Sequence, residues 1–210
     1  QLFALAEIKS GIRLVVLNAR TGRLEWSQQL VDLERSVQQD PTRRLAGATP
    51  SLADGILVCP TSAGAVVAVD TTRHSLLWAY KYPQRNDSHS SQWLRIRVFQ
   101  GRASSNSPSS DHWVDPRVTL ANGRVLLTPV ASDQLHCLSL TDGSVLWTAP
   151  RDHDLLLACA HRDNVILVGT ETLRARRLVD GSAAWQKPIQ LPSNGRPSGR
   201  GYYSGDFYYL

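Results

Sequence analysis

The sequence contains no methionine, only three cysteines and no long apolar run. Its longest unbroken apolar stretch is the six residues from Leu155 to Ala160, whereas a membrane-spanning helix needs about 20. No membrane span is therefore expected. No signal peptide is recognisable at Gln1, because a basic segment and a cleavage site are missing. Gln1 is not an initiator and residues 206–210 look like mid-strand, so we expect a piece of a longer protein.

The three cysteines form no redox or metal motif. Cys59, Cys137 and Cys159 stand in apolar, strand-like contexts, and no C-x-x-C or His/Cys ligand spacing occurs. An odd number leaves at least one of them unpaired within this chain. Cysteine behaves as a small apolar residue in such contexts, and we interpret all three as buried structural thiols.

Several motifs of enzymes and nucleic-acid-binding proteins are also missing. There is no G-x-x-x-x-G-K-[ST] phosphate loop, no G-x-G-x-x-G and no G-x-S-x-G nucleophile elbow. The net charge of +5 comes from 20 arginines against 3 lysines, and these are scattered along the chain. A nucleic-acid site would concentrate them on one patch, so no nucleic-acid partner is expected.

The densest cluster of ionisable groups is Asp152-His153-Asp154. A metal or acid–base site needs such groups to converge in a cleft. These three fall in a predicted connection between repeats, where charged residues are routine, and we interpret them as an ordinary loop. The sequence thus predicts no catalytic, cofactor-binding or metal-binding residue.

What the sequence does contain is an internal repeat that ends on tryptophan. Four segments align, 16–26, 68–78, 137–147 and 175–185, and their last residues are Trp26, Trp78, Trp147 and Trp185. Ten residues before each tryptophan stands a small or β-branched residue. Four residues before it stands a glycine in three of the repeats: Gly22, Gly143 and Gly181. A T-G or D-G pair between apolar residues predicts a hairpin, with the tryptophan on its second strand.

A second strand pair precedes three of these hairpins. Its turn is marked by Asp54-Gly55, Asn122-Gly123 and Asp163-Asn164, and a further copy begins at 199–207. A complete unit thus holds four short antiparallel strands in 38 residues, the spacing between the last two tryptophans. Four-stranded units of that length predict β-propeller blades.

We therefore predict an all-β protein, a β-propeller of four-stranded antiparallel blades, with about four blades' worth present as an incomplete ring. The predicted segments are a partial blade at 1–30, an insert at 31–46, a blade at 47–82, a polar insert at 83–112, blades at 113–150 and 151–190, and the start of the next blade at 191–210. The alternation of residues 94–98 inside the second insert favours an added edge strand over a ligand site.

The recurring residues have a structural explanation. A tryptophan can pack across the interface between blades with its N–H on a backbone carbonyl, and the turn glycine adopts a positive φ at little steric cost. We expect the four tryptophans to be equivalent and largely buried. His74 occupies the glycine position of the second repeat, and histidine is enriched at positive φ, so a degenerate turn is expected there.

The pattern A-V-D-x-x-x-x-x-L-L-W at 68–78, and T-G or D-G followed by tryptophan in the other repeats, resembles the pyrroloquinoline-quinone (PQQ) enzyme repeat. The resemblance covers nearly the whole chain outside the two inserts and implies a PQQ-binding-like propeller from bacteria. Members include quinoprotein alcohol dehydrogenases with eight blades and outer-membrane assembly lipoproteins that bind no quinone. It also implies export to the periplasm or cell surface.

The resemblance does not transfer an activity. Quinoprotein dehydrogenases use two adjacent cysteines, an aspartate base and calcium ligands, and no position here matches them. PQQ and calcium are therefore possible only through the family. We predict a non-catalytic scaffold or interaction platform for other segments of the parent protein. The alternatives are part of a PQQ-dependent dehydrogenase whose active site lies outside this piece, and a glycan-binding propeller that uses exposed aromatic residues, namely Tyr202, Tyr203, Trp93 and Trp113.

Overall fold

The computed structural model describes residues 1–33, 36–40, 43, 48–85, 112–192, 197, 199, 201–205 and 207–209. They belong to two compact units, Gln1–Ser109 and Ser110–Leu210. The described residues form strands β1 to β17 and one short 3-10 helix, η1 (Val37–Gln39). In this part of the chain no helix is long and apolar enough to cross a membrane.

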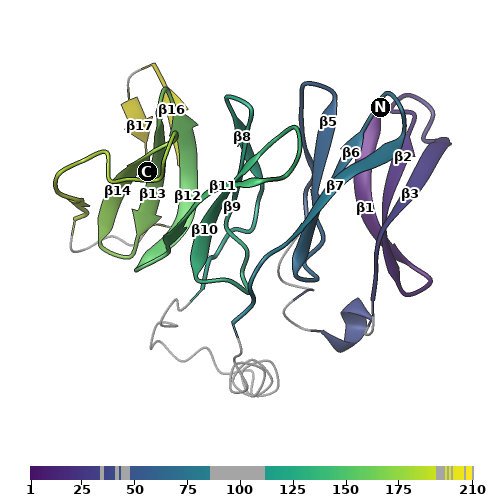
Figure 1. Ribbon diagram of the computed structural model, residues 1–210, viewed down its shortest axis with the longest axis horizontal. Coiled ribbons are helices and arrows are strands. Elements are labelled where there is room, and N and C mark those ends of the chain that lie inside the picture. Colours follow the sequence, from purple (N-terminus) through teal and green to yellow (C-terminus); the bar gives the residue numbers. More distant parts are fainter. Residues whose placement is uncertain are drawn as a thin grey trace. The chain divides into compact units, whose positions relative to one another are not determined.

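The first unit contains two antiparallel sheets (Figure 1). The first sheet has three strands in the order β1 (Leu2–Ile8), β2 (Gly11–Leu17) and β3 (Leu24–Asp32). The second has four strands in the order β4 (Ser51–Ala53), β5 (Ile56–Pro60), β6 (Ala65–Asp70) and β7 (Ser75–Lys81). Each strand pairs with its neighbour in the sequence, as expected for a blade.

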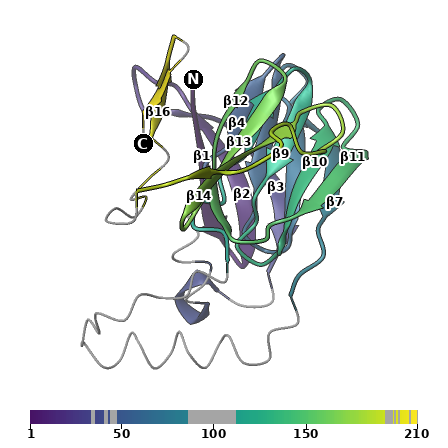
Figure 2. The same ribbon diagram turned by 90° about the vertical axis from the view of Figure 1, so that its left-hand side faces the viewer.

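The second unit contains two four-stranded sheets and a hairpin; β9 to β14 and β16 are labelled in Figure 2. The third sheet consists of β8 (Thr119–Ala121), β9 (Arg124–Leu127), β10 (Gln134–Ser139) and β11 (Val145–Pro150). The fourth sheet consists of β12 (Asp154–His161), β13 (Asn164–Gly169), β14 (Thr172–Arg177) and β15 (Ile189–Gln190). The hairpin pairs β16 (Tyr202–Ser204) with β17 (Phe207–Tyr209).

In the second and third sheets the turn between the first two strands lies at the predicted Asp-Gly or Asn-Gly pair. Asp54 and Gly55 have φ values of 50° and 76°, and Asn122 and Gly123 have 46° and 69°. Two successive positive φ values define the hairpin turn that Asp-Gly and Asn-Gly favour. In the fourth sheet the turn lies one residue earlier than predicted. His161 pairs with Asn164 there, so the central residues are 162 and 163.

The tryptophan hairpins share one register. Trp26 pairs with Val16, Trp78 with Ala68 and Trp147 with Cys137, and a bulge follows each pair. The small or β-branched residue ten positions earlier is thus the direct cross-strand neighbour of the indole. The residue four positions before the tryptophan has a positive φ in all four repeats, including 54° at His74. The expected left-handed turn at His74 is confirmed.

The fourth repeat departs from the prediction, because Trp185 lies outside any strand. Only an isolated bridge between Arg176 and Ala183 continues the common register, and β14 then pairs with the short β15. The two residues before Trp185 are alanines, where the second and third repeats have larger apolar residues, and Pro188 has no N–H to donate. The outer strand of this sheet is therefore mostly lost.

Successive sheets within each unit pack face to face. In the first unit Leu14 and Val16 of the first sheet share a buried cluster with Leu57, Cys59 and Val69 of the second. In the second unit a buried cluster joins the third and fourth sheets, and its aliphatic members include Leu126, Leu135, Leu157, Val165 and Leu167. Strands covered on both faces need nearly continuous apolar sequences, which explains the runs seen in the sequence.

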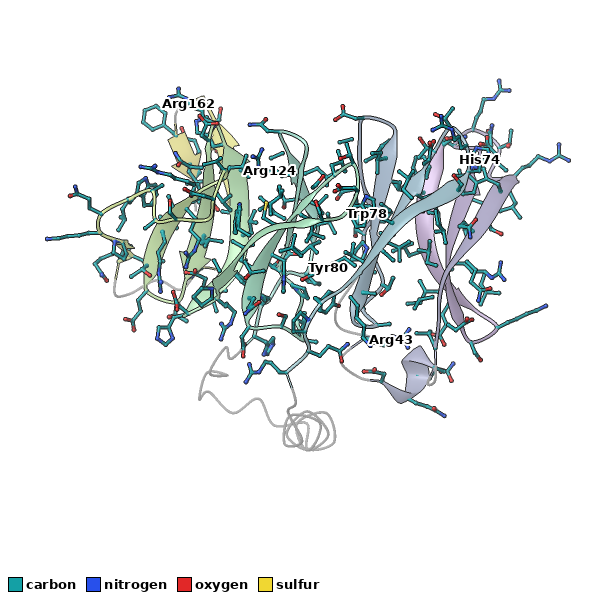
Figure 3. The ribbon with its side chains drawn as sticks, viewed as in Figure 1. Arg43, His74, Trp78, Tyr80, Arg124 and Arg162 are labelled. Atoms are coloured by element: carbon teal, nitrogen blue, oxygen red, sulfur yellow. The ribbon has the colours of Figure 1, made fainter. Side chains whose placement is uncertain are left out.

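The predicted inserts are only partly described. β3 extends to Asp32, inside the first insert. Arg43 of the same insert forms an ion pair with Glu7 of β1, with 2.9 Å between Nη2 and Oε2 (Arg43 is labelled in Figure 3). Residues 86–111 of the second insert lie outside the described residues, and so do the predicted edge strand at 94–98 and Trp93.

His74 also contacts a tryptophan of the preceding sheet. Its ring stacks on Trp26 with 4.3 Å between centroids and 20° between planes. The indole Nε1 of Trp26 is buried and finds no hydrogen-bond partner among the described residues. A histidine thus stands where the repeat otherwise has a glycine.

Replacing His74 with glycine has two opposing effects. It relieves a left-handed residue by about 1 kcal/mol and removes an aromatic pair worth about 0.5–1.5 kcal/mol. We expect His74→Gly to be neutral or mildly stabilising in urea denaturation. His74→Ala, which keeps a Cβ at positive φ, is the control and should be clearly less stable. A marked loss with glycine would show that the stack on Trp26 dominates.

Candidate functional site

Trp147 links the third sheet to the fourth. The ring is buried, and its Nε1 donates a hydrogen bond to the backbone oxygen of Leu178 at 3.0 Å. A Cβ placed on Gly181 would lie 2.5 Å from Cε3 of the indole. Two features therefore require glycine at position 181. Its φ is 72°, and the indole ring lies too close to leave room for a Cβ.

The expectation that all four tryptophans are largely buried is wrong for three of them. Trp26, Trp78 and Trp185 are half-buried, and Trp26 meets His74 instead of a glycine. A Cβ on Gly22 would meet nothing within 4 Å, so only its φ of 70° favours glycine there. Gly143 has a φ of 72°. For these residues a role in holding blades together stays a prediction.

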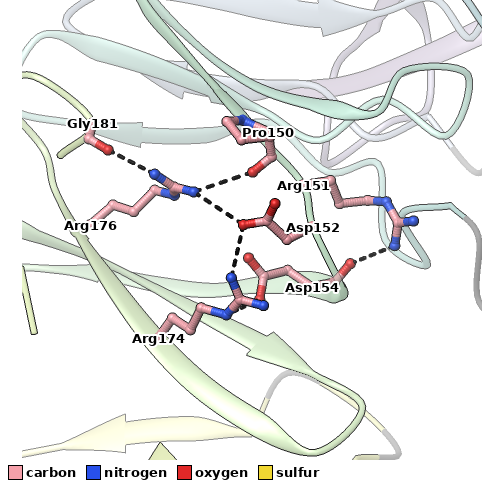
Figure 4. Close-up of polar contacts among 7 residues, drawn as sticks. All are labelled: Pro150, Arg151, Asp152, Asp154, Arg174, Arg176 and Gly181. Carbon is pink, nitrogen blue, oxygen red and sulfur yellow. Dashed lines mark hydrogen bonds and ion pairs between the residues drawn. The ribbon is translucent and has the colours of Figure 1, made fainter. Parts of the chain in front are cut away.

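A charge cluster, in which Asp154 is buried and Asp152 is exposed, occupies the connection between β11 and β12 (Figure 4). The sequence interpretation of an ordinary loop is wrong for Asp154, which is the first residue of β12 and has no exposed surface. Arg174 of β14 lies 2.8 Å from Asp152, between Nη1 and Oδ2. Its Nε lies 3.5 Å from Oδ1 of Asp154. Tertiary packing therefore brings together groups that are 22 residues apart.

Two further arginines fix the backbone around this cluster. Arg176 donates from Nη1 to the oxygen of Gly181 at 3.0 Å and from Nη2 to that of Pro150 at 3.3 Å. Arg151 donates from Nη1 to the backbone oxygen of Asp154 at 2.9 Å. Arg176 thus ties the turn under Trp147 to the end of β11. The other repeats have aliphatic residues at the aligned position, namely Leu17, Val69 and Leu138. An arginine at this position is the feature of the sequence that could have indicated the cluster.

Burial sets the protonation of the cluster. Loss of hydration raises the pKa of Asp154 to about 6, although Arg174 and Arg176 act in the opposite direction. Both carboxylate oxygens lack a hydrogen bond from the described residues. The ion pair with Arg174 is therefore the main compensation for its charge.

This donor set does not fit a calcium ion of the kind that the PQQ family implies. Calcium takes six to eight oxygen ligands, whereas Asp152 and Asp154 face arginine side chains. Among the described residues no group of three or more His, Cys, Asp or Glu side chains could hold a metal ion. The cluster is arranged to join two sheets.

A second polar pair, Ser132 and His136, is buried. Ser132 Oγ lies 3.0 Å from Nε2 of His136, and both residues are buried. Burial lowers the pKa of His136 to about 4, so the imidazole is neutral at pH 7. A serine beside a neutral histidine has the composition of a nucleophile and its base, but no substrate could reach these two side chains in their buried position.

The cysteines are largely as interpreted. None forms a disulfide, and Cys59 and Cys137 are buried. Burial raises the pKa of each of these two thiols to about 12. Cys159 is half-buried, and burial raises the pKa of its thiol as well. These are poor nucleophiles, because the thiolate is the reactive form.

The aromatic residues proposed for glycan contact have different positions. Trp113 is fully buried and donates from Nε1 to the oxygen of Gln134 at 3.2 Å, so its predicted exposure is wrong. Tyr202 is exposed and stacks on Tyr209 with 4.8 Å between ring centroids. Phe207 on the same hairpin is also exposed. Trp93 and the side chain of Tyr203 lie outside the described part.

Repeated four-stranded antiparallel sheets with an aligned tryptophan define a PQQ-repeat β-propeller, and the comparisons confirm this class. The chain belongs to the family described as outer membrane protein assembly factor BamB, whose model matches residues 5–111 and 90–201. No match was found among curated proteins.

Solved structures share the fold. BamB from Moraxella catarrhalis aligns with a TM-score of 0.52 and 12% identity over 87% of this chain and 47% of that chain. Our chain thus spans about half the length of that protein. Quinohemoprotein alcohol dehydrogenases from Comamonas testosteroni (TM-score 0.43, 20% identity, 67% and 21% covered) and Pseudomonas putida HK5 (0.47, 11%, 86% and 33%) also match.

Truncation of Trp147 tests the link between the third and fourth sheets. Trp147→Ala should lower the free energy of unfolding by about 3–5 kcal/mol, because a buried ring and its hydrogen bond to Leu178 are lost. Trp185→Ala, at a half-buried ring, is the matched control and should cause a smaller loss. Denaturant unfolding measures both, and a loss below about 1 kcal/mol at Trp147 would contradict the role.

The raised pKa of Asp154 predicts a pH dependence of stability. An acid with a raised folded pKa stabilises the fold at low pH, and this contribution is lost as the pH rises from about 4 through about 6. The shift corresponds to about 3 kcal/mol. Urea denaturation from pH 4 to 7 should therefore show Asp154→Asn gaining stability relative to wild type as the pH rises. Asp142→Asn, at a fully exposed site, is the control; parallel profiles for wild type and Asp154→Asn would refute this prediction.

Proposed function

We propose that this chain is a non-catalytic propeller region that acts as a scaffold or protein-interaction platform within a larger protein. The observation that carries the proposal is the β16–β17 hairpin. It presents Tyr202, Phe207 and Tyr209 with 63%, 68% and 48% of their surface exposed. Large exposed apolar groups that lie together on a soluble protein mark an interaction surface, and tyrosine is enriched at such surfaces.

The buried polar groups support the same proposal. The most elaborate described cluster uses Arg174 and Arg176 to neutralise Asp152 and Asp154 and to hold backbone oxygens. Ser132 and His136 are buried and contact each other. These groups serve the packing of sheets, which a platform needs in order to present a rigid surface.

The family description is consistent with this function. It names an outer membrane protein assembly factor, and assembly is a task of binding and positioning. Because that description refers to the outer membrane, we also propose that this chain acts outside the cytoplasm, in the periplasm or at the cell surface. The glycan-binding alternative now rests on Tyr202 and its stacked partner, since Trp113 is buried.

The rival function is that of a quinone-dependent dehydrogenase. Calorimetric titration of the protein with PQQ, with and without calcium, separates the two. We expect no saturable heat up to about 200 µM cofactor, a concentration at which even weak sites fill. An apo-form quinoprotein dehydrogenase serves as the positive control. Saturable binding that depends on calcium would overturn the scaffold proposal and direct attention to alcohol or sugar substrates.

A further inference from the structure

Arg174 lies between two carboxylates and donates a hydrogen bond to one of them (Figure 4). Its Nη1 donates to Oδ2 of Asp152 at 2.8 Å. Its Nε lies 3.5 Å from Oδ1 of Asp154. That Nε and both carboxylate oxygens of Asp154 are buried and have no hydrogen-bond partner among the described residues. A small movement of the guanidinium would therefore bring it from Asp152 to Asp154.

The two carboxylates differ in their access to water. The side chain of Asp152 is 41% exposed, whereas that of Asp154 has no exposed surface. A buried carboxylate without a partner is much less stable in its charged form than as a neutral acid, because the charge has lost its hydration. The arrangement with Arg174 on Asp152 therefore fits the neutral form of Asp154. Burial raises the pKa of Asp154 to about 6, so the acid changes form in mildly acidic solution.

The other groups around Asp154 have different tasks. The charged groups that act on it come from β14 and from its own connection, namely Arg174, Arg176, Arg151 and Asp152. Arg176 donates to two backbone oxygens and Arg151 to one. β13 places the uncharged Gly169 opposite Asp154, and Tyr208 of β17 packs on the leucines that follow it. Among the described residues, Arg174 is the arginine of this cluster that can move without releasing a backbone oxygen.

Asp152 holds the connection between β11 and β12 in a left-handed conformation. Its φ is 52°, which is unfavourable for a residue that has a Cβ. Arg174 and Arg176 both approach its Oδ2, at 2.8 and 3.7 Å. These two ion pairs offset the strain of the backbone. If Arg174 leaves, the shorter pair is lost and the connection loosens.

We propose that Arg174 changes its carboxylate partner with pH, from Asp152 when Asp154 is neutral to Asp154 when Asp154 is charged. The proton that Asp154 loses goes to solvent, and the guanidinium stays charged throughout. The connection between β11 and β12 is then fixed in mildly acidic solution and loosened at neutral pH. This switch adds a movement to the pH-dependent stability predicted above, and it does not depend on the proposed scaffold function.

The Nε–Hε signal of Arg174 in a two-dimensional ¹H–¹⁵N NMR spectrum tests the movement directly. The whole chain is titrated from about pH 4.5 to about pH 7.5, a range that includes the change of form of Asp154. The Hε signal should move downfield with a midpoint near pH 6, because the N–H then donates to a charged carboxylate. Its absence in Arg174→Lys identifies the signal.

Two variants provide the matched controls. Asp154→Asn keeps the size of the side chain but has no carboxyl group to titrate, so its Arg174 signal should stay constant. Asp142→Asn changes an aspartate in an exposed turn and should titrate like wild type. Circular dichroism checks that both variants are folded. A constant signal in wild type, or the same titration in Asp154→Asn, would overturn the proposal. The wild-type result is decisive even if a variant does not fold.

Hydrogen exchange measures the loosening of the connection. The amides of Arg151 and Asp154 donate to backbone oxygens within or beside it. The rise in pKa of Asp154 from 3.8 to about 6 corresponds to about 100-fold in an equilibrium constant. Protection of these amides, corrected for the intrinsic effect of pH, should therefore fall at least about tenfold across the titration. Asp154→Asn should keep its protection, and Asp152→Asn should lack the acid-stabilised state. Equal protection of the wild-type amides at both ends of the range would contradict the switch.

Discussion

The constraint on which this structure depends is that each sheet has two apolar faces and must bury both. Leu126 is covered by the next sheet and Val165 by the previous one, and the same alternation recurs along the chain. It explains why the strands are almost continuously apolar and why Trp147 reaches from the third sheet to the fourth.

Where the regular pairing of strands is lost, arginine side chains hold the backbone instead. The fourth sheet has lost most of its outer strand around Trp185. There Arg176 holds both Gly181 and Pro150 by their backbone oxygens. Neighbouring arginines also make it possible to bury Asp154, whose desolvation is otherwise unfavourable. The cluster therefore resembles a reactive site in composition, but its geometry serves the junction between the third and fourth sheets.

Membership of the BamB family and the shared propeller fold do not by themselves assign an activity, because one fold supports many functions. What separates the possibilities here is the placement of particular groups. The proposed binding function rests on carboxylates paired with arginines, a buried serine–histidine pair and aromatic rings on the surface.

The sequence alone determined the order of the strands, the hairpin turns of the first three blades and the shared register of Trp26, Trp78 and Trp147. These features depend on local chemistry: a positive φ favours glycine or asparagine, and alternation defines a strand. Only the tertiary structure decided that Trp113 is buried, that Asp154 faces arginines and that Trp185 lies outside a strand. The partners involved are 20 or more residues away, at Gln134 for Trp113 and in β14 for the aspartates. Burial and charge pairing depend on which distant segments of the chain contact each other. Local sequence patterns do not predict these contacts.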